Sequence, residues 1–161
     1  MPNDLPQLPS LDAHGLLPPG VYDCSLEDVE RLFGQFQRSD RRLRLFAHLR
    51  DYIDQLQKAG IKAQVIIDGS FVMGCVDEPD DIDLVLVLPA DWDFSVDLPP
   101  YRYNLIAKHR VGRRYGFDLI VVAADSSAET QWTDFFQGIG PKWRHLPRSA
   151  DDRKGVLRII A

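Results

Sequence analysis

The sequence has few cysteines, no long apolar run and no excess of positive charge, and each shortage excludes a class of protein. Its two cysteines, Cys24 and Cys75, are too few for a disulfide framework and lack the spacing of a metal site, which favours a reducing cytoplasm. No window approaches the roughly 18 consecutive apolar residues of a membrane span, and the N-terminus lacks a basic region followed by an apolar one. We therefore expect neither secretion nor insertion into a membrane.

The net charge of -5 excludes one mode of nucleic-acid binding. A protein that neutralises many phosphates along a long nucleic acid needs a broad basic face, although a local basic patch is compatible with this charge. The composition, 45% hydrophobic and 27% charged, is that of an ordinary soluble globular protein. The function therefore has to be sought in particular residues.

Prolines and glycines concentrate at the start of the chain. The first 20 residues hold five prolines and two glycines, a density that forbids regular structure and predicts an extended, proline-rich arm over residues 1–22. The whole chain of 161 residues suits one globular unit. We expect residues 23–161 to form a single domain.

Two helices are predicted in the first third of the domain. Ser25 followed by Asp28 is a capping-box signature, and apolar residues then recur at helical spacing. A longer helix, capped by Ser39 or Asp40 and ending at Gly60, carries apolar residues at three- and four-residue steps. Its charged residues are interpreted as a solvated face: Arg41, Arg42, Arg44, Arg50, Asp51 and Asp54.

The remaining pattern alternates apolar strands with helices. One helix is expected over residues 99–116 and another over residues 127–140, where Trp132, Phe135 and Phe136 fit core packing. A strand that is apolar on both faces is normally central in its sheet and covered above and below, which predicts an α/β or α+β layer fold. The expected strands are residues 62–68, 82–89 and 117–124, with "GVLRII" as a final edge strand.

Two aspartates stand at the start of the strand over residues 82–89. Residues two apart on a strand point to the same side, so the carboxylates of Asp81 and Asp83 are expected to project together and repel. A raised pKa, a nearby cation or a bound divalent metal would relieve that repulsion. The other acids of this stretch, Asp77, Glu78 and Asp80, are assigned to a solvated turn.

The position of the pair before its strand excludes several known Asp-x-Asp signatures. Haloacid-dehalogenase-type phosphatases and many glycosyltransferases place the pair after an apolar strand. An EF-hand loop requires a glycine at its sixth position and a glutamate at its twelfth. None of these patterns fits Asp81 and Asp83.

An ordered set of motifs remains, and it resembles a known superfamily. Gly69 and Ser70 follow one strand, the Asp81 and Asp83 pair begins the next, and Asp118 lies in the later strand "YGFDLIVV". Over residues 65–122 this order is similar to that of the nucleotidyltransferase superfamily of the DNA polymerase β type, particularly its minimal members. The opening and the end of the chain also resemble those of small bacterial nucleotidyltransferase-like proteins.

The resemblance implies a fold, a site and a reaction. The implied fold is of the α+β class (α/β layers), with a mixed β-sheet of about four strands flanked by helices. Gly69 and Ser70 would hold nucleotide phosphates, and Asp81, Asp83 and Asp118 would bind Mg²⁺ or Mn²⁺, with Asp118 also the candidate general base. The implied substrate is a nucleoside triphosphate such as ATP. The acceptor is a protein, an RNA end or a small molecule, and minimal members often act with a separate helical protein partner.

The sequence departs from the family at one point. Many minimal members carry an arginine shortly after the Gly-Ser pair, whereas here residues 71–73 are Phe-Val-Met and no basic residue lies between Lys62 and Arg102. Lys108 and Arg110, in the basic run before Asp118, are therefore the candidate cations for the nucleotide.

Two questions stay open on the sequence alone. Trp143, in a Gly/Pro-rich loop, is either a surface aromatic or a platform for a base. The departure at residues 71–73 also supports a second hypothesis, a nucleotide-binding or catalytically weak regulatory module, such as one member of a toxin–antitoxin or phage-defence pair.

Overall fold

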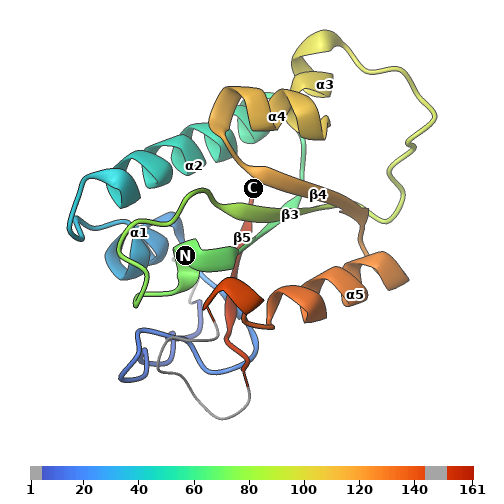
Figure 1. The fold of residues 1–161 in the computed structure, drawn as a ribbon. Helices are drawn as coiled ribbons and strands as arrows, with labels where there is room; N and C mark the ends of the chain where they lie inside the picture. The colour runs from blue at the N-terminus through green and yellow to red at the C-terminus, as the bar shows by residue number, and fades with distance from the viewer. Residues whose placement is uncertain (1–4, 144–151) are drawn as a thin grey trace.

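A mixed five-stranded β-sheet forms the centre of the computed structural model, which describes residues 5–143 and 152–161 (Figure 1). The strand order is β1-β5-β2-β3-β4. β2 is antiparallel to both of its neighbours, whereas β1 pairs with β5, and β3 with β4, in parallel. The strands are β1 (Val21–Asp23), β2 (Gln64–Asp68), β3 (Asp83–Leu88), β4 (Asp118–Ala123) and β5 (Val156–Ile160).

The fifth strand corrects two predictions. The α+β class is confirmed, but the sheet has five strands instead of about four because β1 forms at the end of the stretch assigned to the arm. The "GVLRII" segment is consequently an internal strand and not an edge. Arg158 on β5 fixes β1 beside it through Asp23, with Nε 2.6 Å from a carboxylate oxygen. Residues 5–20 have no helix or strand, although Leu16 and Leu17 are buried.

Helices cover the two faces of the sheet unequally (Figure 1). α1, α2, α3 and α4 lie on one face and α5 on the other. No helix among the described residues is long and apolar enough to cross a membrane. The helices are α1 (Leu26–Phe33), α2 (Arg41–Lys58), α3 (Pro100–Ile106), α4 (Lys108–Tyr115) and α5 (Ser127–Phe136).

After Asp83, every residue of β3 is apolar and buried, because helices cover both faces of the strand. Leu84 and Leu86 pack into the core beneath α1 to α4, while Val85 and Val87 pack into the smaller core beneath α5. Successive side chains of a strand point to opposite faces of the sheet. Because helices cover both faces here, both sets of β3 side chains are buried. This burial holds β3 as the central support for the aspartates at its start.

The helix expected over residues 99–116 is divided in two. Ala107 has an extended backbone between α3 and α4, although no glycine or proline marks the break. The Tyr52 hydroxyl, buried on α2, donates a 2.7 Å hydrogen bond to the carbonyl of Leu105. That carbonyl is satisfied by a tertiary contact, which the local sequence could not reveal. The capping box at Ser25 and the boundaries predicted for α2 are confirmed.

Arg42 lies in the core, which overturns its assignment to a solvated face. Its side chain is 1% exposed and its guanidinium donates four hydrogen bonds of 2.6–3.0 Å, to the carbonyls of Phe33, Phe71, Met73 and Val76. Burial lowers its pKa to about 10, so the group is still a cation at neutral pH. One side chain on α2 thus fixes the end of α1 and the chain after Gly-Ser.

We expect Arg42→Met to destabilise the protein by about 3 kcal/mol or more, because it leaves buried carbonyls without donors. Urea unfolding measures this. Arg44→Met is the matched control, since Arg44 is exposed and pairs with Asp40, four residues earlier, and its loss should cost about 0.5 kcal/mol or less. Similar losses for the two variants would contradict the structural role of Arg42.

Candidate functional site

Three aspartates are aligned across one end of the sheet. In the strand register Asp68 at the end of β2 pairs with Asp83 at the start of β3, and Asp83 pairs with Asp118 at the start of β4. Residues directly opposite on neighbouring strands project to the same face. That face is the one covered by α5, because Ile66 and Val85, two residues along, pack there.

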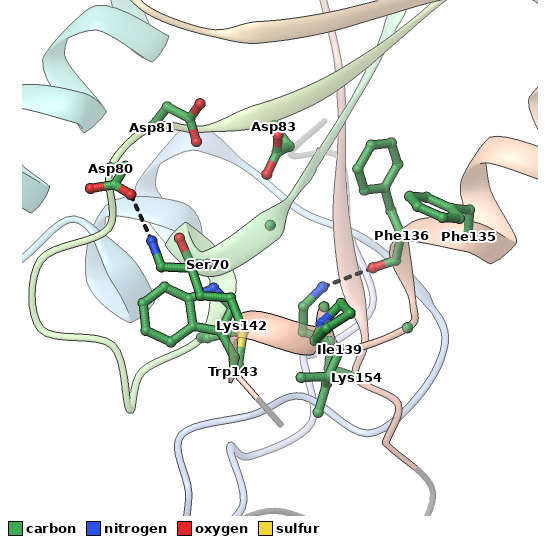
Figure 2. Close-up of a pocket in the computed structure, with 15 residues that line it drawn as sticks. Ser70, Asp80, Asp81, Asp83, Phe135, Phe136, Ile139, Lys142, Trp143 and Lys154 are labelled. Atoms are coloured by element: carbon green, nitrogen blue, oxygen red, sulfur yellow. Dashed lines mark hydrogen bonds and ion pairs between the residues drawn. The ribbon is translucent and has the colours of Figure 1, made fainter. Parts of the chain in front are cut away.

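A cavity of about 430 Å³ opens at this end of the sheet (Figure 2). One side comes from the turn after β2 and the run leading to β3, with Ser70, Asp81 and Asp83. The other side comes from the end of α5 and the segment after it, including residues 138–143. Lys154, before β5, completes the wall. The predicted residues Gly69, Ser70, Asp81 and Asp83 are thus brought together around one cavity.

Gly69 allows the turn to pass close to Asp83. Its φ of +78° lies in the left-handed region, which favours glycine. A Cβ at this position would overlap a carboxylate oxygen of Asp83 and lie 2.8 Å from its Cγ. A short 3₁₀ helix, η1 (Gly69–Val72), begins at this glycine and places Ser70 on the cavity wall. Both the backbone conformation and the contact with Asp83 therefore favour glycine here.

Asp68 is fully buried with neither carboxylate oxygen hydrogen-bonded among the described residues. Burial raises its pKa well above the ordinary value, and the charges of Asp83, Asp118 and Asp81 add to the rise. Lys154, 2% exposed, acts in the opposite direction on Asp68. Burial lowers the pKa of Lys154 itself, and its Nζ donates a 2.8 Å hydrogen bond to the carbonyl of Phe136.

The predicted pair of aspartates is strained electrostatically. Burial, followed by the charges of Asp81 and Asp118, raises the pKa of Asp83 to about 7. Burial and the charge of Asp118 also raise the pKa of Asp81. Of the three remedies expected for such repulsion, a raised pKa is therefore present at both positions, and Lys154 supplies a nearby cation for Asp83.

Asp118 stands at the exposed end of the row. Its carboxylate lies 3.1 Å from Nζ of Lys108 on α4, and both side chains are about half exposed or more. The predicted cation Lys108 is thus beside the predicted acid Asp118. Arg110, on the same helix, is exposed and does not line the cavity.

One of two assignments made from the sequence changes at the mouth of the cavity. Asp80 is in an exposed turn, as expected, but it also lines the cavity and lies 2.9 Å from Nζ of Lys142 (Figure 2). Phe135, expected in the core, is 65% exposed and also lines the cavity. Trp132 and Phe136 do pack against the sheet. Trp143 lines the cavity, with Nζ of Lys142 4.8 Å from its ring centre.

Sequence reasoning missed three charged residues of the site: Asp68, Lys142 and Lys154. Asp68 ends an apolar strand directly before Gly69, and that position was a usable signal, because a carboxylate there must enter the site or be buried. No local pattern marks the two lysines. They come from segments more than 50 residues away, which only the folded sheet brings to the cavity.

The donor chemistry of the row suits a hard divalent cation. Carboxylate oxygens are the ligands that Mg²⁺ prefers, and the unpartnered oxygens of Asp68 beside the crowded Asp81 and Asp83 fit that preference. Within the described ranges, however, no group of three or more His, Cys, Asp or Glu side chains is gathered closely enough to hold a metal ion.

Gly69→Ala should destabilise the protein more than Gly116→Ala does. Both glycines have nearly the same backbone, φ +78° and +77°, so both substitutions carry a left-handed penalty of about 1–2 kcal/mol. The new Cβ would collide with Asp83 at Gly69, whereas at Gly116 no described residue other than those adjacent in the chain comes within 4 Å of it. Urea unfolding of the two variants isolates the contact, and equal losses would contradict it.

The free energy of unfolding should fall as pH rises from about 4 to about 7. The unfolded chain releases the Asp83 proton near the ordinary pKa of 3.8, whereas the folded protein retains it to about pH 7. Stabilisation by this proton is therefore complete below the unfolded pKa and is lost as pH rises through the folded one. Asp83→Asn should show a shallower dependence in urea unfolding across that range. Identical pH profiles for wild type and variant would count against the raised pKa.

Comparison with known proteins identifies a family. No curated protein and no solved structure matches the chain. The model of a family of unknown function, DUF6932, matches residues 9–160, which include the whole sheet and every residue described at the cavity. Since this match spans nearly the entire sequence, the chain belongs to the DUF6932 family.

Proposed function

We propose that this protein is a metal-dependent nucleotidyltransferase, which moves a nucleoside monophosphate from a nucleoside triphosphate to a protein, an RNA end or a small molecule. The observation that carries the proposal is the cavity wall on which Asp81 and Asp83 lie beside the Gly69–Ser70 turn. This arrangement agrees with the order of motifs that resembles the nucleotidyltransferase superfamily.

The carboxylates support the proposal through their charge. Asp81 and Asp83, which both line the cavity, would hold Mg²⁺ or Mn²⁺, since Mg²⁺ is commonly bound by one or two carboxylates together with the phosphates of its substrate. When bound, the metal supplies positive charge to phosphate oxygens during an in-line displacement. Burial and then repulsion by Asp81 and Asp118 raise the pKa of Asp83 to about 7, and the repulsive part would fall in the presence of such a cation.

The cavity has a volume and a polarity suited to a nucleotide. A volume of about 430 Å³ is within the range of roughly 300–1,000 Å³ for small-molecule sites. Met73, Phe136 and Ile139 give the cavity an apolar side, while the Ser70 hydroxyl and the two lysines give it polar groups. Asp118, at the exposed end of the row, is the candidate to accept a proton from an approaching acceptor hydroxyl.

Asp83→Asn should reduce nucleotide transfer by about 100-fold or more, because it removes a charge aimed at the reacting groups. The measurement uses purified protein, Mg²⁺ and each α-³²P-labelled nucleoside triphosphate in turn, with lysate as the source of acceptor. Label is then followed in protein, RNA and small-molecule fractions. Asp97→Asn, a change at an exposed aspartate between β3 and α3, is the matched control and should transfer as the wild type does.

Two results would sink the transfer reaction. The first is labelling that persists unchanged in Asp83→Asn. The second is wild-type protein that binds a triphosphate without labelling any fraction, which would favour the nucleotide-binding regulatory module instead.

A further inference from the structure

We propose that Lys154 forms a phosphate-binding subsite on the wall of the cavity, where its ammonium group contacts the terminal phosphates of an oligophosphate. The inference rests on the proposed function for the identity of the ligand and supplies the cation that is missing after Gly-Ser. No local sequence pattern marks Lys154 as a phosphate ligand, so the inference comes from the folded structure.

The backbone around Lys154 delivers its side chain to the cavity. Its N–H donates 2.8 Å to the carbonyl of Gln137, and the next residue, Gly155, donates 2.9 Å to Leu17. Lys154 precedes Val156 by two residues, and Val156 packs on the face of the sheet beneath α5. The side chain of Lys154 therefore lies on the same face of the sheet as that of Asp68, and hydrogen bonds hold the backbone at Lys154 and at the next residue.

The ammonium group has capacity left for a ligand. A lysine carries three N–H donors, and among the described residues one hydrogen bond is made by Nζ of Lys154, to the carbonyl of Phe136. Figure 2 shows this bond at the cavity, with Ser70 and Asp83 on the facing wall. A buried cation of this kind interacts with an anion far more strongly than an exposed one does.

The other cations near the site are less suited to this role. Arg42 uses its guanidinium on four carbonyls and does not line the cavity. Lys108 pairs with Asp118 outside it, and Lys142 pairs with Asp80 at the exposed mouth. Lys154 is the buried cation of the wall, 2% exposed.

The balance of charge makes oligophosphate binding dependent on a divalent cation. Acids on the wall outnumber its lysines: Asp80, Asp81 and Asp83 stand against Lys142 and Lys154. An anion alone would be repelled, whereas a divalent cation at the acids would leave Lys154 free to attract the phosphates. Lys154 should therefore have opposite effects on the two ligands, favouring triphosphate and disfavouring a cation bound alone.

Isothermal titration calorimetry with inorganic triphosphate in excess Mg²⁺, and separately with Mg²⁺ alone, tests this. Lys154→Met should weaken triphosphate binding by about 10- to 100-fold, as expected for one hydrogen bond between charged groups. The same variant should bind Mg²⁺ as well as the wild type or more tightly, because a positive charge beside Asp68 and Asp83 is removed. Lys58→Met, at an exposed lysine paired with Asp54, is the control and should change neither affinity.

A measurement on the wild type keeps the test valid if Lys154→Met does not fold. The ¹⁵Nζ resonance of Lys154, assigned by lysine side-chain NMR, should shift on addition of triphosphate with Mg²⁺ more than that of Lys58. The proposal is overturned by unchanged triphosphate affinity in the variant, by parallel loss of both ligands, or by an unmoved Lys154 resonance at saturation. If triphosphate binding depends on Lys154 but no nucleotide is transferred, the transfer reaction is rejected. The phosphate-binding subsite at Lys154 is then still supported.

Discussion

Repulsion among carboxylates at one end of the sheet is the interaction around which this part of the molecule is arranged. The register of β2, β3 and β4 places Asp68, Asp83 and Asp118 side by side, and no rotamer change can separate their backbones. Asp68 is fully buried and Asp83 partly buried, whereas Asp118 is exposed, so water screens the charges least at the Asp68 end of the row. Burial is the largest cause of the raised pKa values of Asp68, Asp81 and Asp83, and the charges of the neighbouring aspartates add to it.

Three lysines from different parts of the chain each lie near a different part of this acidic site. Lys154 faces the buried end of the row, Lys108 meets Asp118 at the exposed end, and Lys142 meets Asp80 at the mouth. The charges are therefore partly balanced around the cavity and least balanced at its centre. This gradient is the physical basis of both proposals, because it favours a divalent cation at the centre and an anion beyond it.

The apolar residues after Gly-Ser have a structural explanation. Phe71, Val72 and Met73 are buried, so a charged side chain at these positions would have to enter the core. The cation closest to this backbone is Arg42, which holds the turn through the carbonyls of Phe71 and Met73. Its position in a helix rich in charged residues concealed it, because helical spacing alone does not distinguish an arginine that is buried against carbonyls from one in solvent.

The sequence by itself determined the α+β class, the three central strands, α1, α2 and α5, and the shared side of Asp81 and Asp83. These features depend on local spacing, turn chemistry and the length of apolar runs, which neighbouring residues encode. The expectation that Gly69 and Ser70 join the two aspartates at one site came from the order of motifs that resembles the nucleotidyltransferase superfamily. Tertiary structure alone decided the fifth strand, the break at Ala107 and the entry of Lys142 and Lys154 into the cavity. Each of these depends on pairing between segments distant in the chain, whose partners no local pattern specifies.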